Sequence, residues 1–309
     1  MRLRSIGAEE KEKPMAAYDF VTLDVFTDRK FTGNQLAVLL DAQGLSLEQM
    51  QTITREFNYA ESTFVLPPEN PDNTARVRIF TPGYEMPFAG HPTVGTAIAV
   101  ARAKGLKGQV KLELNTGVFP VDVDVKETGG FAEFQNPNLP DETGPAPSVE
   151  QIAAALSLPA SAIDVGSHKP RRCGAGVDYI YVKAPMDAVK AAQVNSAVWD
   201  DLALEEIVGV YLYAQGGEGP DADYHARMFA PGAGVVEDAA TGSAAAGIPA
   251  QIVRSENIPD GVHRWVIEQG VEMGRPSRIR ATVSVEGGAV QSVRIGGDAV
   301  FVQEGRIFI

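Results

Sequence analysis

A long segment of this chain occurs twice in modified form, and this repeat constrains the fold more than any other feature of the sequence. Residues 79–97 read IFTPGYEMPFAGHPTVGTA, and residues 228–247 read MFAPGAGVVEDAATGSAAAG. Both contain Phe-x-Pro-Gly and a variable stretch, and then a small residue, Gly and a polar residue lead into an Ala-rich segment. A second pair, SLEQMQTIT at 46–54 and SVEQIAAAL at 148–156, is short enough to arise by chance. The longer pair predicts two structurally similar halves.

Local patterns predict many strands and a few helices, which together make an α+β fold. A capping box of Ser46 and Gln49 opens one helix. Pro92, at a first helical position, opens another that runs to about Lys104, where Gly105 stops it. Runs rich in β-branched and aromatic residues predict strands within residues 18–27, 31–41, 62–68, 75–82, 109–125, 263–269, 278–287, 289–297 and 299–309.

The chain has 309 residues, which is long enough for two lobes. We expect the mixed-charge residues 1–17 to form a disordered N-terminal tail, residues 18–130 an N-terminal lobe and residues 131–299 a C-terminal lobe. The last strand, at about 300–309, is expected to complete the N-terminal lobe. The stretch 136–147 is rich in Pro, Asn and Gly and is interpreted as a linker.

Composition argues against several classes of function. A formal net charge of −13 disfavours a nucleic acid or an anionic membrane as partner. No apolar run is long enough to span a membrane, and the first residues lack the apolar core of a secretory signal. Cys173 is the only cysteine, which excludes an intrachain disulfide and a cysteine-rich metal site and fits a reducing cytoplasm. No GxGxxG, P-loop, HExxH or CxxC motif occurs, so no cofactor or metal is expected.

Each copy of the repeat places a glycine at an expected helix start. The first backbone N–H groups of a helix have no partner within it and lie at the positive end of its dipole. Gly90 and Gly242 lack a Cβ, so an anion can approach these amides closely. Two such starts facing each other would hold a substrate carboxylate, whereas either one alone would be an ordinary helix cap.

Three ionisable side chains near the repeats are candidates for acid–base chemistry. His91 is either an acid, base or hydrogen-bond donor at the anion site, or a cap of the helix. Asp238 either stabilises the second helix start or orients the His91 ring. Glu61, in the context NYAEST, is either a general base whose pKa is raised by apolar neighbours or an exposed loop residue. The remaining histidines are interpreted as surface or core residues: His168, His225 and His263.

Four blocks of sequence occur in an order that is specific to one family. They begin at residues 24, 78, 227 and 268 and read DVFTDRKFTGNQLAVLLDAQGLSLEQMQTITREFNYAESTFV, RIFTPGYEMPFAGHPTVGTA, RMFAPGAGVVEDAATGSAAAG and EQGVEMGRPSRI. Together they resemble the PhzF-like phenazine-biosynthesis isomerases from about Tyr18 to the C-terminus. The resemblance implies the fold of diaminopimelate epimerase, with two pseudo-symmetric lobes, each a mixed β-sheet wrapped around a central helix, and an active site in the cleft. It also implies a homodimer.

The resemblance also implies a reaction and roles for particular residues. The family's enzymes are cofactor-free isomerases that move a proton on a dihydro-hydroxyanthranilate, a small carboxylate-bearing substrate. Carried over by position, Glu61 is the general base, and His91 and Asp238 form the hydrogen-bonded pair that assists it. The substrate-binding residues implied in the same way are Gly90, Gly242, Ser243, Asn34 and Thr241.

The chain differs from the cysteine-dependent epimerases and from the family pattern at a few positions. The related epimerases and racemases use two cysteines, and this chain has Ala89 and Thr241 at those places, so a two-thiol mechanism is not expected. Pro249 lies inside the expected second central helix and should kink it or end it early. Arg171 and Arg172 either contact an acidic substrate or, as we prefer, lie on the surface.

Fold alone does not determine function, so two alternatives to the isomerase stay open. One is a non-catalytic metabolite-binding or interaction protein with the same lobes and anion site. The other is an epimerase of a small acid that uses Glu61 with a second base.

Overall fold

The computed structural model describes residues 16–204 and 206–309. The expected tail, residues 1–17, lies outside the described residues as far as Met15. Ala16 exchanges backbone hydrogen bonds with Ile309, and Ala17 is the first residue of strand β1. The two ends of the described chain are therefore paired with each other.

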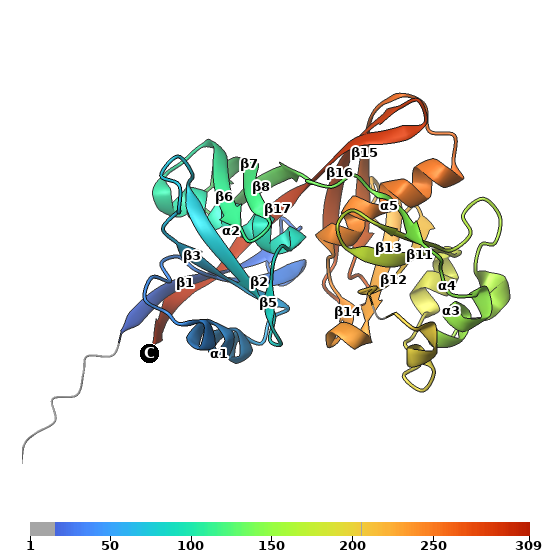
Figure 1. Cartoon of the computed structure of the whole chain (residues 1–309), viewed down its shortest axis with the longest axis horizontal. Helices are drawn as coiled ribbons and strands as arrows, with labels where there is room; N and C mark the ends of the chain where they lie inside the picture. The colour runs from blue at the N-terminus through green and yellow to red at the C-terminus, as the bar shows by residue number, and fades with distance from the viewer. Residues whose placement is uncertain (1–15, 205) are drawn as a thin grey trace, which may run out of the picture.

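The described residues form a mixed α+β fold rich in strands, as the sequence predicts, and Figure 1 shows two bodies side by side. We call these bodies the N-terminal half and the C-terminal half. The N-terminal half contains β1 (Ala17–Val25), β2 (Asn34–Leu39), α1 (Leu47–Phe57), β3 (Glu61–Leu66), β4 (Ala75–Phe80), β5 (Glu85–Met86), α2 (Gly90–Lys104), β6 (Gly108–Leu114), β7 (Gly117–Lys126) and β8 (Gly129–Gln135).

The C-terminal half contains the remaining elements, together with three short 3₁₀ helices at Ala160–Ala162, Trp199–Leu202 and Pro231–Ala233. Its strands and α-helices are β9 (Asp141–Gly144), α3 (Val149–Ala155), β10 (Arg171–Gly174), β11 (Asp178–Lys183), α4 (Met186–Ala191), β12 (Gly209–Gln215), β13 (Tyr224–Ala230), β14 (Val235–Asp238), α5 (Gly242–Ser255), β15 (Gly261–Gln269), β16 (Ser277–Glu286) and β17 (Ala289–Phe308).

The order of strand pairing in one half is repeated in the other. In the N-terminal half β2 pairs parallel with β3, β3 antiparallel with β4, β4 parallel with β6 and β6 antiparallel with β7. In the C-terminal half β11, β12, β13, β15 and β16 pair in the same sequence of directions. The helices α2 and α5 follow the short strands β5 and β14, so the repeated segments occupy equivalent places.

The long strand β17 connects the two halves. Its first part pairs with β16, its middle pairs with β8, and its last part pairs with β1 (Figure 1). Strand β8 pairs with β7 from Gly129 to Phe134, so a division of the chain after residue 130 would cut a strand. The stretch 136–147 is more than a linker, because β9 within it pairs with β10.

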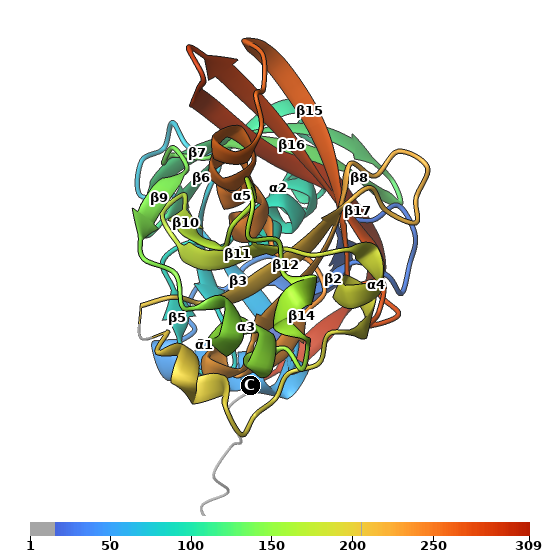
Figure 2. The ribbon, with the colours of Figure 1, turned by 90° about the vertical axis from the view of Figure 1, so that its right-hand side faces the viewer.

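The helices that begin in the two repeated segments, α2 and α5, are largely buried. Figure 2 shows α5 in front of α2 when the C-terminal half faces the viewer. Every residue of α2 from Gly90 to Ala101 is buried, and β1, β7 and β8 pack against this helix. Helix α5 packs against β10, β11 and β17. The many small residues of the two repeats allow this close approach of backbone to backbone.

The prediction that Pro249 ends the second helix early is wrong, because α5 continues beyond it to Ser255. A proline inside a helix removes one hydrogen bond and crowds the preceding turn. The residues on both sides of Pro249, from Ala244 to Ile252, are buried. Burial of this apolar surface on several sides outweighs the loss of one backbone bond.

The predicted capping box is present and a second one occurs in the other short segment, but the two helices that they open are not equivalent. Ser46 and Gln49 cap α1, and Ser148 and Gln151 cap α3 in the same way. Helix α1 lies between β2 and β3, whereas α3 precedes β10. The short pair of similar segments is therefore a coincidence of local capping and not part of the repeat.

Candidate active site

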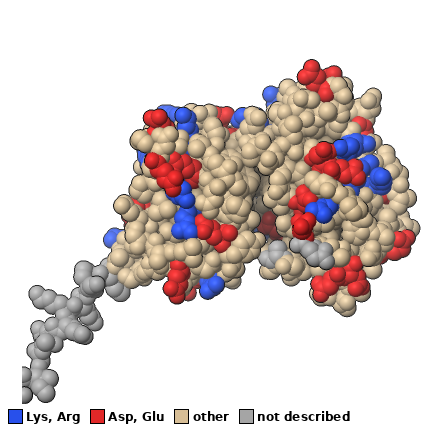
Figure 3. Space-filling view, viewed as in Figure 1, with Lys and Arg blue, Asp and Glu red and all other residues tan. Residues whose placement is uncertain are grey.

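A cavity of about 1030 Å³ lies between the two halves, and the space-filling view in Figure 3 shows the surface hollowed there. Residues from both halves line it. All eight residues that the sequence analysis selected for the site are among them: Asn34, Glu61, Gly90, His91, Asp238, Thr241, Gly242 and Ser243.

Glu61 and His91 face each other across a short gap in this cavity. Glu61 is the first residue of β3 and His91 is the second residue of α2, and His91 Nε2 lies 3.3 Å from Glu61 Oε2. The two atoms are not aligned as a hydrogen bond, and neither has a hydrogen-bond partner among the described residues. Buried polar atoms are normally paired, so this orphaned pair indicates a site where a ligand binds.

Burial changes the acidity of both side chains in opposite directions. It raises the pKa of the Glu61 carboxyl group well above its usual value, and the nearby charge of Asp238 raises it further. Burial lowers the pKa of His91 to about 3, although a hydrogen bond with the Gln35 backbone acts in the other direction. A proton shared between these two side chains therefore belongs to Glu61, and His91 is neutral at pH 7.

The surroundings of the ring favour the tautomer of His91 with its hydrogen on Nδ1. Nε2 has no hydrogen-bond partner among the described residues, and the Gln35 backbone raises the pKa of the ring as a hydrogen-bond acceptor would. Asn34 Nδ2 lies 3.4 Å from Nδ1, but its two hydrogens are used at Asp238 Oδ1 (2.8 Å) and at the Ala240 carbonyl (3.0 Å). Nε2 therefore carries the free lone pair and faces the carboxyl group of Glu61.

Asp238 ends β14 and interacts with His91 only through Asn34. Its Oδ1 accepts from the amide of Asn34 and its Oδ2 accepts from the Thr241 hydroxyl at 2.7 Å. Burial raises the pKa of Asp238 to about 6 against these hydrogen bonds, which lower it. The hydrogen-bonded pair of His91 and Asp238 that the resemblance implies is not formed, because the Asp238 carboxylate bonds Asn34 and Thr241 instead, and Asn34 lies 3.4 Å from the ring.

The starts of α2 and α5 touch at their glycines. A Cβ on Gly90 would lie 2.9 Å from the Gly242 Cα and 3.1 Å from the Gly242 carbonyl carbon. A Cβ on Gly242 would lie 3.2 Å from the Gly90 Cα. A Cβ at Gly90 cannot fit without a shift of backbone, and one at Gly242 would be tight, so the two backbones meet closely because both residues are glycine.

Both helix starts leave their first amides available to a ligand. The N-cap residues are Ala89 and Thr241, and within the described residues no side-chain hydrogen bond caps either helix. The Thr241 hydroxyl, which could have capped α5, donates to Asp238 instead. Unpaired N–H groups at two helix starts that meet in a cavity form a binding site for an anion.

Three further residues of the site were not found from the sequence. Tyr179 on β11 lines the cavity, and its hydroxyl lies 2.7 Å from Ser243 Oγ. Gln269, at the end of β15, is buried and bonds Thr241 and the Asp238 carbonyl, and Tyr211 donates to Gln269. In the sequence these residues belong to strand patterns, which give no signal of a site.

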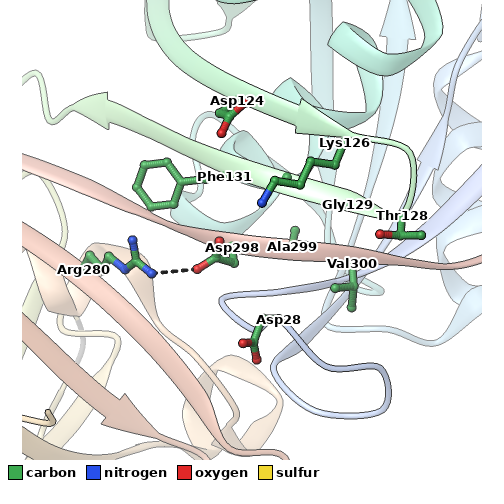
Figure 4. A pocket seen from close by; sticks show the side chains of 11 residues that line it. Asp28, Asp124, Lys126, Thr128, Gly129, Phe131, Arg280, Asp298, Ala299 and Val300 are labelled. Atoms are coloured by element: carbon green, nitrogen blue, oxygen red, sulfur yellow. Dashed lines mark hydrogen bonds and ion pairs between the residues drawn. The ribbon is translucent and has the colours of Figure 1, made fainter.

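A second cavity, of about 400 Å³, is lined by none of the residues of the first (Figure 4). Lys126 and Arg280 are its cationic side chains, and Arg280 is paired with Asp298 at 2.9 Å and lies over the Phe131 ring. These groups satisfy one another, in contrast to Glu61 and His91. The candidate active site is therefore the larger cavity.

The remaining histidines and the two arginines have structural partners. His168 is buried between Tyr213 and Glu256, and His263 contacts the Pro259 carbonyl. Arg171 is buried and donates to Gln251, so the expectation of a surface arginine is wrong for it. The partners of Arg171, Gln251 and Ser255, lie on α5, about eighty positions away in the sequence, so the local pattern could not predict its burial. Arg172 pairs with Asp178, and Cys173 is buried.

His225 is fully buried between two carboxylates. Its Nδ1 lies 2.8 Å from Glu268 and its Nε2 lies 2.9 Å from Glu272. Burial alone lowers its pKa, but the hydrogen bonds to both carboxylates outweigh burial and raise it to about 9. His225 is therefore an imidazolium ion that ties β13 to β15 and to the turn after β15.

This ion pair predicts a pH-dependent stability. A histidine whose pKa is raised on folding stabilises the fold fully below its unfolded pKa of about 6.5, and that stabilisation is lost as the pH rises through 9. Between these values we expect the free energy of unfolding to fall by on the order of 3 kcal/mol. Urea denaturation at pH 6.5 and 9 measures this fall. It should be much smaller in His225→Gln and unchanged in His263→Gln; an equal fall in both variants would contradict the prediction.

Within residues 16–204 and 206–309, no group of three or more His, Cys, Asp or Glu side chains is arranged so that it could hold a metal ion. Across the same residues, no helix has the length and apolar character needed to cross a membrane.

A carboxyl group that faces an imidazole nitrogen beside two uncapped helix starts defines a candidate site for acid–base chemistry. Comparison with known proteins identifies the family. The family model described as "Phenazine biosynthesis-like protein" matches residues 23–305, and the chain belongs to this family.

Individual relatives cover almost the whole chain. A protein of Mesorhizobium japonicum named an uncharacterized isomerase is 42% identical over 302 residues, which are 96% of this chain and 100% of that protein. The trans-2,3-dihydro-3-hydroxyanthranilate isomerase of Pseudomonas aeruginosa is 36% identical, over 94% of this chain and 99% of that one. The crystal structure of a PhzF-family phenazine biosynthesis protein from Bacillus anthracis has a TM-score of 0.84 at 29% identity, over 96% and 100% of the chains. The chain is therefore an enzyme of the isomerase class, as the sequence predicts.

Proposed function

We propose that this protein is a cofactor-independent isomerase that moves a proton on a small carboxylate-bearing substrate, with Glu61 as the general base. We propose further that the two halves are pseudo-symmetric lobes and that the reaction takes place in the cleft between them. The single observation that carries the proposal is the unpartnered pair of Glu61 Oε2 and His91 Nε2, 3.3 Å apart in the cavity. An orphaned acid–base pair is costly in a folded protein unless it acts on a ligand.

The substrate carboxylate binds at the amides of the two helix starts, between Gly90 and Gly242 with Ser243. The ionised form of Glu61 removes a proton from a carbon alpha or vinylogous to that carboxylate, so a C–H bond breaks and an O–H bond forms. A carboxylate in a buried site is a stronger base than one in water, because its raised pKa increases its affinity for the proton.

The proton then returns to a different carbon of the same substrate. Neutral His91 accepts a hydrogen bond at Nε2 from the protonated Glu61 carboxyl group, and this contact holds the carboxyl group in place between the two steps. On the other side of the ring lies Asn34, which Asp238 holds in place. The product is an enol that relaxes to a ketone, and the substrate and the product have the same atoms.

The names of the relatives suggest the first compound to test, trans-2,3-dihydro-3-hydroxyanthranilate. Incubation of the protein with this acid in D₂O should give an isomer that carries deuterium at one ring carbon, measured by NMR. A panel of related cyclic and acyclic unsaturated acids extends the test to other substrates. Binding of these acids without any deuterium exchange would support the non-catalytic alternative, and exchange with inversion at the same carbon would support an epimerase.

A further inference from the structure

One buried hydroxyl group next to the anion site has no role in the reaction described above. Tyr179 on β11 lines the cavity but is only 2% exposed, and its hydroxyl lies 2.7 Å from Ser243 Oγ. Ser243 follows Gly242 at the start of α5 and is more exposed than Tyr179. The Ser243 hydroxyl is thus the one of the pair that a ligand at the helix start can reach.

This arrangement has a counterpart in the N-terminal half. His91 follows the helix-start glycine of α2 as Ser243 follows that of α5. Strand β2 has the same place in the order of pairing as β11, and Asn34 on β2 contacts His91 as Tyr179 on β11 contacts Ser243. In each half, a side chain of the equivalent strand therefore lies next to the polar residue that follows the glycine, and only in the C-terminal half is this contact a short hydrogen bond.

Two hydroxyl groups 2.7 Å apart share one hydrogen, and the other hydrogen is free to make a second bond. Either hydroxyl can be the donor; because Tyr179 is the more deeply buried, we infer that its hydrogen bonds to Ser243 Oγ, which leaves the Ser243 hydrogen for a ligand in the cavity. Burial also raises the pKa of Tyr179, against the effect of the Ser243 hydrogen bond, so the phenol remains a donor across the working pH range.

We propose that Tyr179 is a positioning residue that fixes the Ser243 hydroxyl as a hydrogen-bond donor to the substrate carboxylate. The proposal rests on the function proposed above, because it assigns the carboxylate to the start of α5. Without the phenol hydroxyl, the Ser243 hydroxyl can rotate and loses its preferred direction. Tyr179 then acts on carboxylate binding only through Ser243.

A matched control lies two residues along the same strand. Tyr181 is also fully buried, and its hydroxyl donates to the Ala244 carbonyl at 2.7 Å. It does not line the cavity. Tyr181→Phe therefore removes a buried hydrogen bond of the same length from the same strand to the same helix without touching Ser243.

The test is a binding titration with 3-hydroxyanthranilate, a stable aromatic carboxylate, on the wild type and on Tyr179→Phe, Ser243→Ala, the double variant and Tyr181→Phe. Loss of a hydrogen bond to a charged group predicts that Tyr179→Phe and Ser243→Ala each weaken binding about tenfold. The double variant should bind like Ser243→Ala alone, because Tyr179 has nothing left to position. Tyr181→Phe should bind like the wild type.

Three results would overturn the proposal: unchanged binding in Tyr179→Phe, additive losses in the double variant, or no binding of 3-hydroxyanthranilate to the wild type. Failure of the proposed function has a different signature. In that case the wild type binds the probe with the expected pattern among the variants, but it exchanges no deuterium with any acid of the panel.

Discussion

Replacing Glu61 by glutamine abolishes deuterium incorporation into the substrate, with a fall in kcat of about 10³-fold if this carboxylate is the base. Glutamine has nearly the same shape and hydrogen-bonding reach, but it cannot accept a proton from carbon at any useful rate. The carboxylate-binding amides lie on α2 and α5, so binding of 3-hydroxyanthranilate should be retained. Exchange in D₂O followed by NMR, with binding measured by titration, separates these two effects.

The same variant should not be less stable than the wild type. A carboxyl group whose pKa is raised on folding stabilises the folded state fully below its unfolded pKa, and this contribution is lost as the pH rises through its folded value. Glutamine carries no such dependence, so Glu61→Gln should unfold at the same temperature as the wild type or a higher one at pH 8. Glu56→Gln, at an exposed position of α1, is the control and should keep full exchange. Full exchange by Glu61→Gln would remove this residue from its role.

The sequence predicts the parts of the site that depend on the repeat. The helix starts at Gly90 and Gly242 follow from the two Phe-x-Pro-Gly segments, because a local turn and a run of small residues determine them. The family resemblance implies that Glu61 and His91 act together, and the apolar neighbours of Glu61 in the sequence indicate a raised pKa. The spacing of the two residues in the chain gives no sign of a contact. Their distance of 3.3 Å depends on where β3 and α2 lie, which local patterns do not determine.

The features that the sequence does not reveal are those made by residues far apart in the chain. Tyr179 reads as an ordinary strand residue until β11 is placed beside α5. His225 looks like one more strand histidine, because the two carboxylates that hold its charge lie more than forty positions away, on β15 and after it. The helix through Pro249 is another case, since tertiary packing there outweighs a local rule.

The largest structural effect is expected where the two helices meet. Gly90→Ala places a Cβ 2.9 Å from the Gly242 Cα, closer than real contacts allow, and the atoms that it meets are backbone. A flexible side chain cannot move aside there, so the two helix starts must separate. Overpacking of this kind costs about 1–3 kcal/mol in the free energy of unfolding, and a shift of about 1 Å at a site can lower activity about 100-fold.

Gly242→Ala meets the same contact from the other side, since its Cβ would lie 3.2 Å from the Gly90 Cα and 3.3 Å from Phe26 Cζ. The Cβ of this variant has more space than that of Gly90→Ala, and one of its neighbours is the Phe26 ring and not backbone. We therefore expect smaller losses of stability and of activity than for Gly90→Ala. Gly232→Ala is the matched control, because Gly232 lines the same cavity and a Cβ there meets nothing within 4 Å. Thermal unfolding and probe titration of the three variants measure both effects. If Gly90→Ala binds the probe as the wild type does, the carboxylate does not need the two helix starts in contact. If Gly232→Ala loses as much stability and binding as Gly90→Ala, the cause is added bulk in the cavity and not separation of the helices.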